Sequence, residues 1–139
     1  MKLSVKSDYA TRAVLSLARR YGDRQAVRVE EIAKENNIPS NYLVQILIEL
    51  KTAKIVKSVR GKSGGYLLAS SPSQITFADV LTCIYGSLLE SPAMADEACP
   101  TALRETWQRL RLAMEQEAGK VNFQQLAEAV QDPARMFYI

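Results

Sequence analysis

The sequence contains no histidine, and its 139 residues include only two cysteines, Cys83 and Cys99. The lack of histidine excludes Ser-His-Asp and Cys-His catalysis and every metal site that needs an imidazole ligand. Two cysteines are too few for a disulfide framework, or for a four-ligand zinc site within one chain. Because no pair of carboxylates lies in an apolar, pocket-like segment either, we expect a protein that is not an enzyme.

Long apolar runs are also missing from the chain. The longest ones fall well short of the roughly 18 residues that a membrane span needs. The N-terminal stretch, MKLSVKSDYATRAV, has no apolar signal core. We therefore expect a cytoplasmic protein with no membrane partner. With 47% apolar and 24% charged residues, the composition is ordinary for one folded domain, or for one domain with an appendage.

The charges are distributed unevenly along the chain. Residues 1–72 hold 13 Lys and Arg against 6 Asp and Glu, whereas residues 73–139 hold 5 against 9. The net charge of +3 therefore combines a first half of +7 with a second half of −4. A basic half of this kind predicts contact with a polyanion, and uneven surface decoration is the alternative.

The first half has the pattern of a helix-turn-helix. A helix is predicted over about 7–21, with Ser7 as its cap, and a short second helix over 29–36. NNIPS (36–40) is predicted to be a turn because its proline disfavours helix at the preceding residue, and Ser40 is a suitable N-cap. A third helix follows in SNYLVQILIELKTA. Its apolar stripe has i, i+3, i+4, i+7 spacing and consists of Leu43, Ile46, Leu47 and Leu50.

A two-stranded hairpin is predicted directly after the third helix. IVKSVR (55–60) is β-branched and alternates, YLLAS (66–70) is the returning strand, and GKSGG is the turn. A helix-turn-helix followed by such a hairpin is a winged helix. We therefore predict a winged helix-turn-helix DNA-binding domain over residues 1–73.

The turn segment VRGKSGGY (59–66) contains GKS, which also ends phosphate-binding loops. Such a loop needs a glycine where Val56 stands, and a helix where Gly64 and Gly65 follow the serine, so nucleotide binding is excluded. Four cations lie at one end of the hairpin: Lys54, Lys57, Arg60 and Lys62. A plain hairpin turn, the alternative, needs glycine but no cations. We interpret the hairpin as a DNA-binding wing, with Arg60 suited to the minor groove.

The N-terminal face of the third helix offers polar groups for reading bases. Asn and Gln can pair with adenine through two hydrogen bonds, and Ser and Tyr suit phosphates or base edges. The alternatives are a simple cap for Ser40 and a plain polar helix face for Gln45. Together with the wing, the predicted DNA-binding residues are Ser40, Asn41, Tyr42, Gln45, Lys57, Arg60, Lys62, Gly64 and Gly65.

Residues 74–139 are predicted to form a helical linker, a sensor loop and a dimerisation region. A fourth helix is expected over 76–89, a loop over 91–99 and a short last helix over 122–130. Between them a long helix, over about 101–118, has a seam with coiled-coil-like spacing. The seam consists of Leu103, Trp107, Leu110 and Met114. We expect these residues to form a dimer interface, because helix-turn-helix proteins commonly bind DNA as two-fold dimers.

Together these stretches resemble the Rrf-two (BadM/IscR-type) family of winged-helix regulators. The resemblance covers about residues 1–90 and is carried by MKLSVKSDYATRAVLSLA, VEEIAKENNIPSNYLVQIL, IVKSVRGKSGGYLLA and ITFADVL. It implies a mainly α-helical protein with a small β-hairpin and a long C-terminal dimerisation helix. It further implies a homodimeric, cytoplasmic bacterial transcription regulator, a repressor in our first hypothesis, that binds roughly palindromic double-stranded DNA.

Many members of this family hold an iron–sulphur cluster through three cysteines in the loop before the long helix. This sequence has only Cys99 in that loop, and Cys83 lies in the preceding helix. Asp8 stands where some members supply an acidic ligand from the partner subunit, although the first turn of a helix also favours an acid. Because thiolates normally supply most ligands of such a cluster, we expect no cofactor and no metal site, with Asp8 and Cys99 as the weak candidates.

Two other functions stay open at this point. Cys99 could form a disulfide that makes the protein a thiol-based redox sensor, or the winged helix could serve protein–protein assembly. A further departure from the family is Lys54, which stands where a glycine commonly ends the third helix. If Lys54 adopts the left-handed conformation, it costs about 1 kcal/mol, and its charge could gain a phosphate contact in exchange.

Overall fold

The computed structural model of the protein describes residues 2–132. Within that range the chain forms six α-helices, a pair of antiparallel strands and three short 3-10 helices. In chain order the main elements are α1 (Val5–Arg19), α2 (Val29–Asn36), α3 (Ser40–Thr52), β1 (Val56–Val59), β2 (Gly65–Leu68), α4 (Phe77–Tyr85), α5 (Thr101–Gly119) and α6 (Phe123–Gln131). The 3-10 helices are η1 (Tyr21–Asp23), η2 (Pro72–Gln74) and η3 (Pro92–Met94). This order confirms the predicted fold class, a mainly helical protein with a winged helix-turn-helix.

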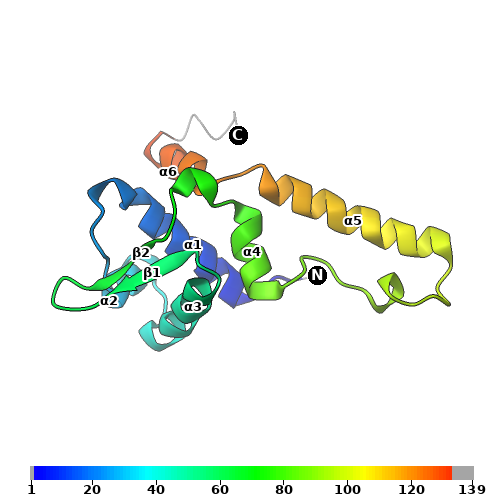
Figure 1. Cartoon of the computed structure of the whole chain (residues 1–139), viewed down its shortest axis with the longest axis horizontal. Coiled ribbons are helices and arrows are strands. Elements are labelled where there is room, and N and C mark those ends of the chain that lie inside the picture. The colour runs from blue at the N-terminus through cyan, green and yellow to red at the C-terminus, as the bar shows by residue number, and fades with distance from the viewer. Residues whose placement is uncertain (1, 133–139) are drawn as a thin grey trace.

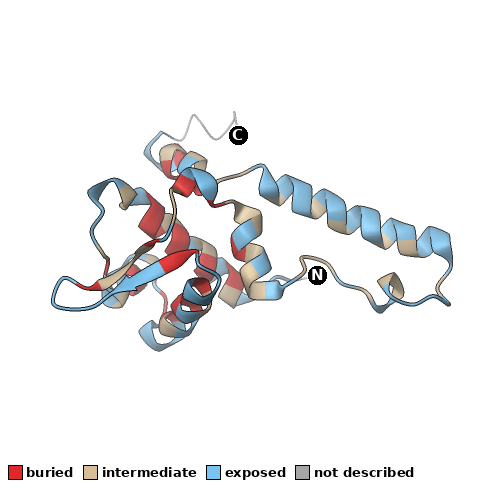
Figure 2. Ribbon diagram, viewed as in Figure 1, coloured by how far each residue is buried: buried red, intermediate tan, exposed pale blue. Residues whose placement is uncertain are grey.

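The hydrophobic core lies in the body formed by α1 to α4, the hairpin and α6 (Figures 1 and 2). The stripe predicted for α3 is fully buried there: Leu43, Ile46, Leu47 and Leu50 are each 0% exposed. The end of the chain returns to this body, because α6 packs on α1 and its Phe123 is also 0% exposed. Phe123 stacks on Phe77 of α4 at a centroid distance of 6.2 Å. One core therefore contains residues from both sides of residue 73.

The N-termini of α1 and α3 differ from the predicted caps. Ser4, not Ser7, caps α1, and its side-chain oxygen accepts a hydrogen bond from the Ser7 backbone N–H at 3.3 Å. Ser7 is buried inside the first turn, where its hydroxyl donates to the Ser4 carbonyl at 2.7 Å. In α3 the extended Pro39 occupies the cap position, so Ser40 is the first helical residue and caps nothing.

The fourth helix is shorter than the sequence pattern predicts. It begins with the capping box that Thr76 and Asp79 form, in which each side chain accepts from the other's backbone N–H. It ends at Tyr85 because Gly86 takes φ 78° and ψ −70°, which a helix cannot continue. The residues predicted to extend this helix to 89 instead begin the loop that leads to α5.

A long arm, residues 86–119, projects from the body (Figure 1). The loop that contains η3 leads away from the body, and α5 returns alongside it (Figure 1). On its way α5 packs on η3 and on α4. None of the residues of α5 is fully buried, whereas the body holds the core (Figure 2). Among the helices within residues 2–132, none combines the length and the apolarity needed to cross a bilayer.

The end of α3 is a left-handed turn at Lys54, which has φ 63°. The Ile55 N–H donates to the Leu50 carbonyl at 2.9 Å, and the Lys54 N–H donates to the Lys51 carbonyl at 2.9 Å. This pair of bonds is a Schellman motif, and it normally uses glycine at the left-handed position. Asn37 ends α2 in the same conformation, with φ 53°. Asparagine adopts this region at a lower cost than lysine does, so Lys54 carries the greater strain.

We expect Lys54→Gly to raise the free energy of unfolding by about 0.5–1 kcal/mol, because glycine adopts the left-handed conformation without steric cost. Asn37→Gly is the matched control and should change the stability less. Chemical denaturation of both variants measures the difference. An equal gain at the two positions would contradict the assigned strain.

Candidate nucleic-acid interface

One side of α3 is buried in the core, and the opposite side is therefore exposed to solvent. Because the stripe of four aliphatic residues points into the core, the side chains of Asn41, Tyr42 and Gln45 point outward, and all three are exposed, as is Ser40. Tyr42 is held in place by Tyr9 of α1, whose ring it meets edge-on at 5.7 Å and 81°. The helix thus presents hydrogen-bonding side chains on a face whose direction is determined by the buried stripe.

Ile48 belongs to this face as well, although its sequence position within an apolar run did not predict it. It is 47% exposed, although it stands within the apolar run of α3. Its spacing of three from Gln45 and seven from Asn41 places it beside them on the helix. Ile48 also falls outside the buried stripe, and that departure is the signal that could have identified it. An exposed apolar side chain on such a helix can contact the methyl group of thymine.

The wing is held by backbone hydrogen bonds on both edges of β2. On one edge β1 and β2 pair in the register Val56↔Leu68 to Val59↔Gly65, with Val56 and Leu68 buried at the base. On the other edge Val27, before α2, exchanges two hydrogen bonds of 2.8 Å with Tyr66. This third segment was not predicted, because a single-residue bridge leaves no periodic pattern.

At two positions of the turn another part of the backbone lies so close that only glycine, which has no Cβ atom, fits. A Cβ atom on Gly65, which has φ 147°, would collide with the carbonyl group of Val27. A Cβ atom on Gly64 would collide with the carbonyl oxygen of Val59, and Gly64 is buried. Both glycines therefore shape the wing, and their contact with DNA stays a prediction.

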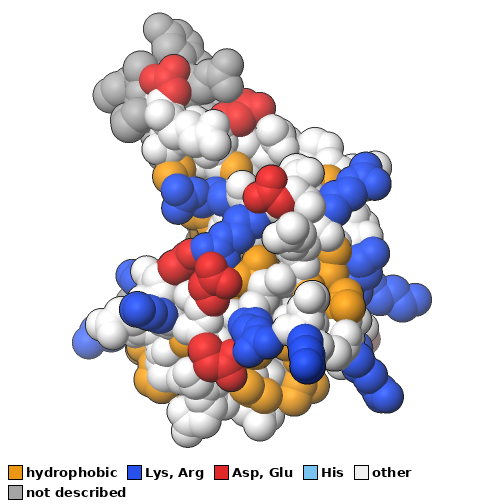
Figure 3. All heavy atoms as spheres, turned by 90° about the vertical axis from the view of Figure 1, so that its left-hand side faces the viewer, with side chains coloured by type: hydrophobic (Ala, Val, Ile, Leu, Met, Phe, Trp, Pro, Cys, Tyr) orange, Lys and Arg blue, Asp and Glu red, His pale blue; other side chains and the backbone are white. Residues whose placement is uncertain are grey.

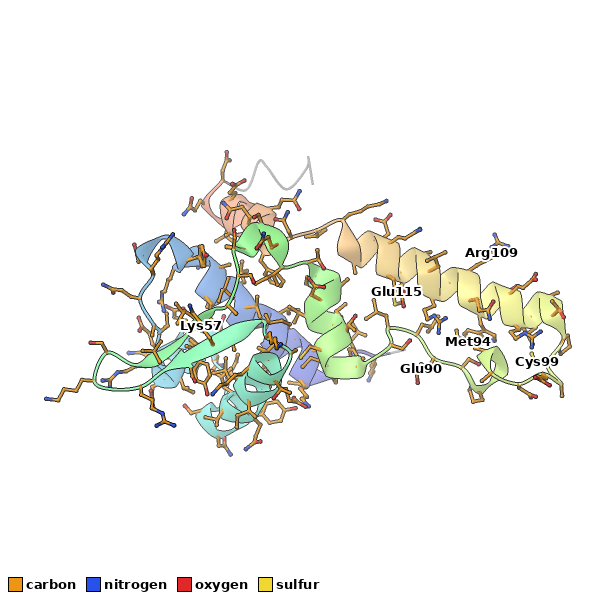
Figure 4. The ribbon with its side chains drawn as sticks, viewed as in Figure 1. Lys57, Glu90, Met94, Cys99, Arg109 and Glu115 are labelled. Atoms are coloured by element: carbon orange, nitrogen blue, oxygen red, sulfur yellow. The ribbon has the colours of Figure 1, made fainter. Side chains whose placement is uncertain are left out.

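The cations predicted for the wing are exposed and have no acidic partner. Lys57, Arg60 and Lys62 are all exposed, and so is Lys54 at the end of α3. Within the described part of the chain none of the four forms an ion pair, whereas Lys6, Arg12, Arg20, Arg111 and Lys120 each do. Figure 3, which views the molecule from the wing end, shows Lys and Arg side chains spread across this surface, and Figure 4 marks Lys57 on the hairpin.

The predicted dimer seam on α5 is divided between two environments. Leu103 and Leu110 are 51% and 53% exposed. Trp107 and Met114 are half-buried on the side of α5 that also carries the other half-buried residues of this helix. Since α5 packs on α4 and η3, this half-buried side is covered by its own chain. Leu103 and Leu110 are left as an uncovered apolar pair on the arm.

The two cysteines lie in different surroundings. Cys83 of α4 is half-buried, and its thiol donates to the Glu49 carbonyl oxygen of α3 at 3.5 Å. Burial raises the pKa of the Cys83 thiol, and the Glu49 carboxylate raises it further, whereas Lys6 lowers it. This thiol is therefore a poor nucleophile. Cys99 lies near the outer end of the arm (Figure 4), and a redox role for it stays a prediction.

The residues present do not fit an iron–sulphur cluster within one chain. No three Cys, Asp or Glu side chains of residues 2–132 come together in a group that could hold a metal ion. Within one chain Asp8 pairs with Arg12 at 3.1 Å on α1, whereas Cys99 lies on the arm (Figure 4). Asp8 and Cys99 of one subunit are thus not brought together.

A helix-turn-helix with an exposed polar face on its second helix, joined to a wing with unpaired cations, is typical of a winged-helix DNA-binding protein. The family model of Rrf2, described as an iron-dependent transcriptional regulator, matches residues 3–129. The chain belongs to this family, as the sequence resemblance predicted, and it is a DNA-binding transcriptional regulator.

Similar proteins agree with this assignment in sequence and in structure. The chain is 34% identical to the HTH-type transcriptional regulator CymR of Bacillus subtilis over the full length of both proteins. The structure of that protein, the global cysteine regulator of B. subtilis, superimposes with a TM-score of 0.80 at 32% identity, over 92% of this chain and 97% of the other. IscR of T. potens gives a TM-score of 0.76 at 28% identity, over 93% and 88%.

We expect Gly65→Ala to lower the free energy of unfolding by about 1–3 kcal/mol, because alanine is strained at φ 147° and collides with the Val27 backbone. Gly22→Ala is the control, since a Cβ atom there meets no neighbour within 4 Å. Urea denaturation of the two variants measures their free energies of unfolding and so tests whether position 65 requires glycine. A Gly65→Ala protein as stable as the Gly22→Ala protein would show that the wing can shift away from Val27.

Proposed function

We propose that the protein is a cytoplasmic homodimeric repressor that binds roughly palindromic double-stranded DNA through α3 and the wing. The observation that carries this proposal is the combination of outward polar side chains on α3 with unpaired cations on the adjoining hairpin. Repression needs only that the dimer occupy an operator overlapping a promoter. Activation would need a further surface for the transcription machinery.

The major groove is the site proposed for α3. It admits one α-helix and displays a different pattern of donors, acceptors and methyl groups for each base pair. Asn41 and Gln45 lie one helical turn apart on the exposed face, so their amides can form hydrogen bonds with neighbouring base pairs. Ile48 continues this face with an apolar side chain, and Tyr42 and Ser40 lie at its edge within reach of the sugar–phosphate backbone.

The wing is proposed to meet the minor groove or the backbone beside it. The narrow hairpin carries three cations without acidic partners: Lys57, Arg60 and Lys62. Their mutual repulsion raises the energy of the free protein. DNA phosphates remove that repulsion, and each phosphate contact releases condensed counterions. Binding should therefore weaken steeply as the salt concentration rises.

The arm is proposed to carry the dimer interface. Leu103 and Leu110 leave apolar surface on a helix that projects from the body, and pairing two such helices would remove it from water. A two-fold axis between the paired arms would present two copies of α3 to the two half-sites of a palindromic operator, as helix-turn-helix dimers commonly do.

Gln45→Ala and Arg60→Ala should change DNA binding in different ways. Against an operator selected from a random pool, Gln45→Ala should lose about tenfold or more in affinity and much less against random duplex, because a base contact is removed. Arg60→Ala should weaken binding to both duplexes and lower the salt slope by about one, because a phosphate contact is removed.

Fluorescence anisotropy in a salt series measures both effects. Equal losses on both duplexes for Gln45→Ala would contradict base reading by α3. Unchanged affinity of Arg60→Ala would contradict the wing assignment. A protein that cannot distinguish a selected operator from random duplex would instead support the protein–protein module.

Leu110→Asp should shift the monomer–dimer equilibrium toward the monomer by about 30-fold or more, because it buries a charge in the apolar interface. Leu112→Asp is the matched control, since Leu112 is 54% exposed but lies on the opposite side of α5. Sedimentation equilibrium compares the two variants. Dissociation by Leu112→Asp but not by Leu110→Asp would place the interface on the other face of the arm.

A further inference from the structure

The tip of the wing is tied to the body by one side chain from outside the hairpin. Arg28, directly before α2, donates a hydrogen bond from its Nη2 atom to the carbonyl oxygen of Lys62 at 2.5 Å. This bond joins positions 34 residues apart and follows immediately on the bridge between Val27 and Tyr66. The segment before α2 therefore holds β2 through its backbone and the tip through a guanidinium group.

No other hydrogen bond within residues 2–132 joins tip residues 60–63 to the body. The turn has one internal bond, from the Gly64 N–H to the Gly61 carbonyl at 3.0 Å. The ladder of the hairpin stops at the pair Val59↔Gly65. Without Arg28, the tip would be anchored only at its two ends, and a short glycine-rich segment of this kind samples many conformations.

The capping of α2 does not explain why an arginine stands at position 28. Arg28 is exposed and stands at the cap position, where its side chain makes no capping hydrogen bond. Its charge adds to an already cationic hairpin, which is unfavourable in the free protein. A neutral side chain would satisfy the start of α2 equally well. The bond to the Lys62 carbonyl is thus the specific interaction that an arginine supplies here.

We propose that Arg28 is a positioning residue for DNA binding, whose guanidinium group holds the wing tip in the orientation in which Arg60 and Lys62 meet DNA. This inference rests on the proposed role of the wing. A tip that is ordered before binding does not lose its conformational freedom when DNA is bound, and the contacts therefore yield a higher affinity. Arg28 would act through the wing and need not touch DNA.

Arg24 provides a matched control. Arg28 and Arg24 both line the hollow between the segment before α2 and the wing, together with Ser63 and Gly64. Both arginines are exposed and carry the same charge, but in the described structure the Arg24 side chain makes no hydrogen bond to the wing. Arg24→Ala thus removes an equal charge from the same place without releasing the tip.

The first test measures affinity for the selected operator and hydrogen exchange of the Gly64 amide in the free protein. Arg28→Ala should weaken binding about three- to tenfold, as expected for one lost hydrogen bond, and should speed exchange at Gly64 several-fold. Arg24→Ala should leave exchange unchanged and weaken binding less. The melting temperature of Arg28→Ala should stay near that of the unchanged protein, because no buried contact is lost. Unchanged Gly64 exchange in Arg28→Ala would overturn the proposal.

A double-mutant comparison separates positioning from a direct contact. In an Arg60→Ala/Lys62→Ala background, Arg28→Ala should have less than about a twofold further effect, because the side chains that it positions are gone. A full further loss would show that Arg28 contacts DNA itself and would overturn the proposal. If Arg60→Ala/Lys62→Ala alone binds normally, the wing assignment fails, whereas the exchange measurement on free protein still decides whether Arg28 holds the tip.

Discussion

The burial of one face of α3 is the constraint on which the other features depend. Four aliphatic side chains of this helix are removed from water, each worth about 1.5–3 kcal/mol, so the helix cannot turn about its axis without a large cost. The outward direction of Asn41 and Gln45 follows from that restriction. The Schellman turn at Lys54 then sends Ile55 and Val56 into the same core. The start of the wing is thereby oriented by the helix that precedes it.

The wing is ordered without the use of its cationic side chains. Val27 and β1 hold β2 through backbone bonds, and Gly65 lets the Val27 backbone approach closely. Side-chain packing holds the wing at its base, through the buried Val56 and Leu68 and the partly buried Tyr66. Since the backbone supplies the order, the cations of the hairpin need not take part in folding. A surface of that kind keeps its charge available for a polyanion.

The sequence predicted those features that repeat along it, and it missed those that depend on single contacts in space. Helical periodicity was sufficient to predict α2 and α3. The alternation of β-branched residues, followed by glycines, was sufficient to predict the hairpin. The choice of Ser4 over Ser7 as cap was not predictable, because both are serines and only burial of Ser7 distinguishes them. The same holds for the Val27–Tyr66 bridge and for the packing of the half-buried side of α5 on α4 and η3.

The root of the arm is fixed to the body by a polar contact as well as by packing. The hydroxyl group of Tyr85, the last residue of α4, lies 2.8 Å from the Ser4 backbone nitrogen and 2.9 Å from the Ser7 hydroxyl on α1. The arm leaves the body at the next residue, Gly86. Because α1 also packs on α3, the direction of the arm and the direction of the exposed face of α3 share one rigid support. In a dimer paired through its arms, the separation of the two α3 helices would therefore be determined by the fold of each subunit rather than by a flexible linker.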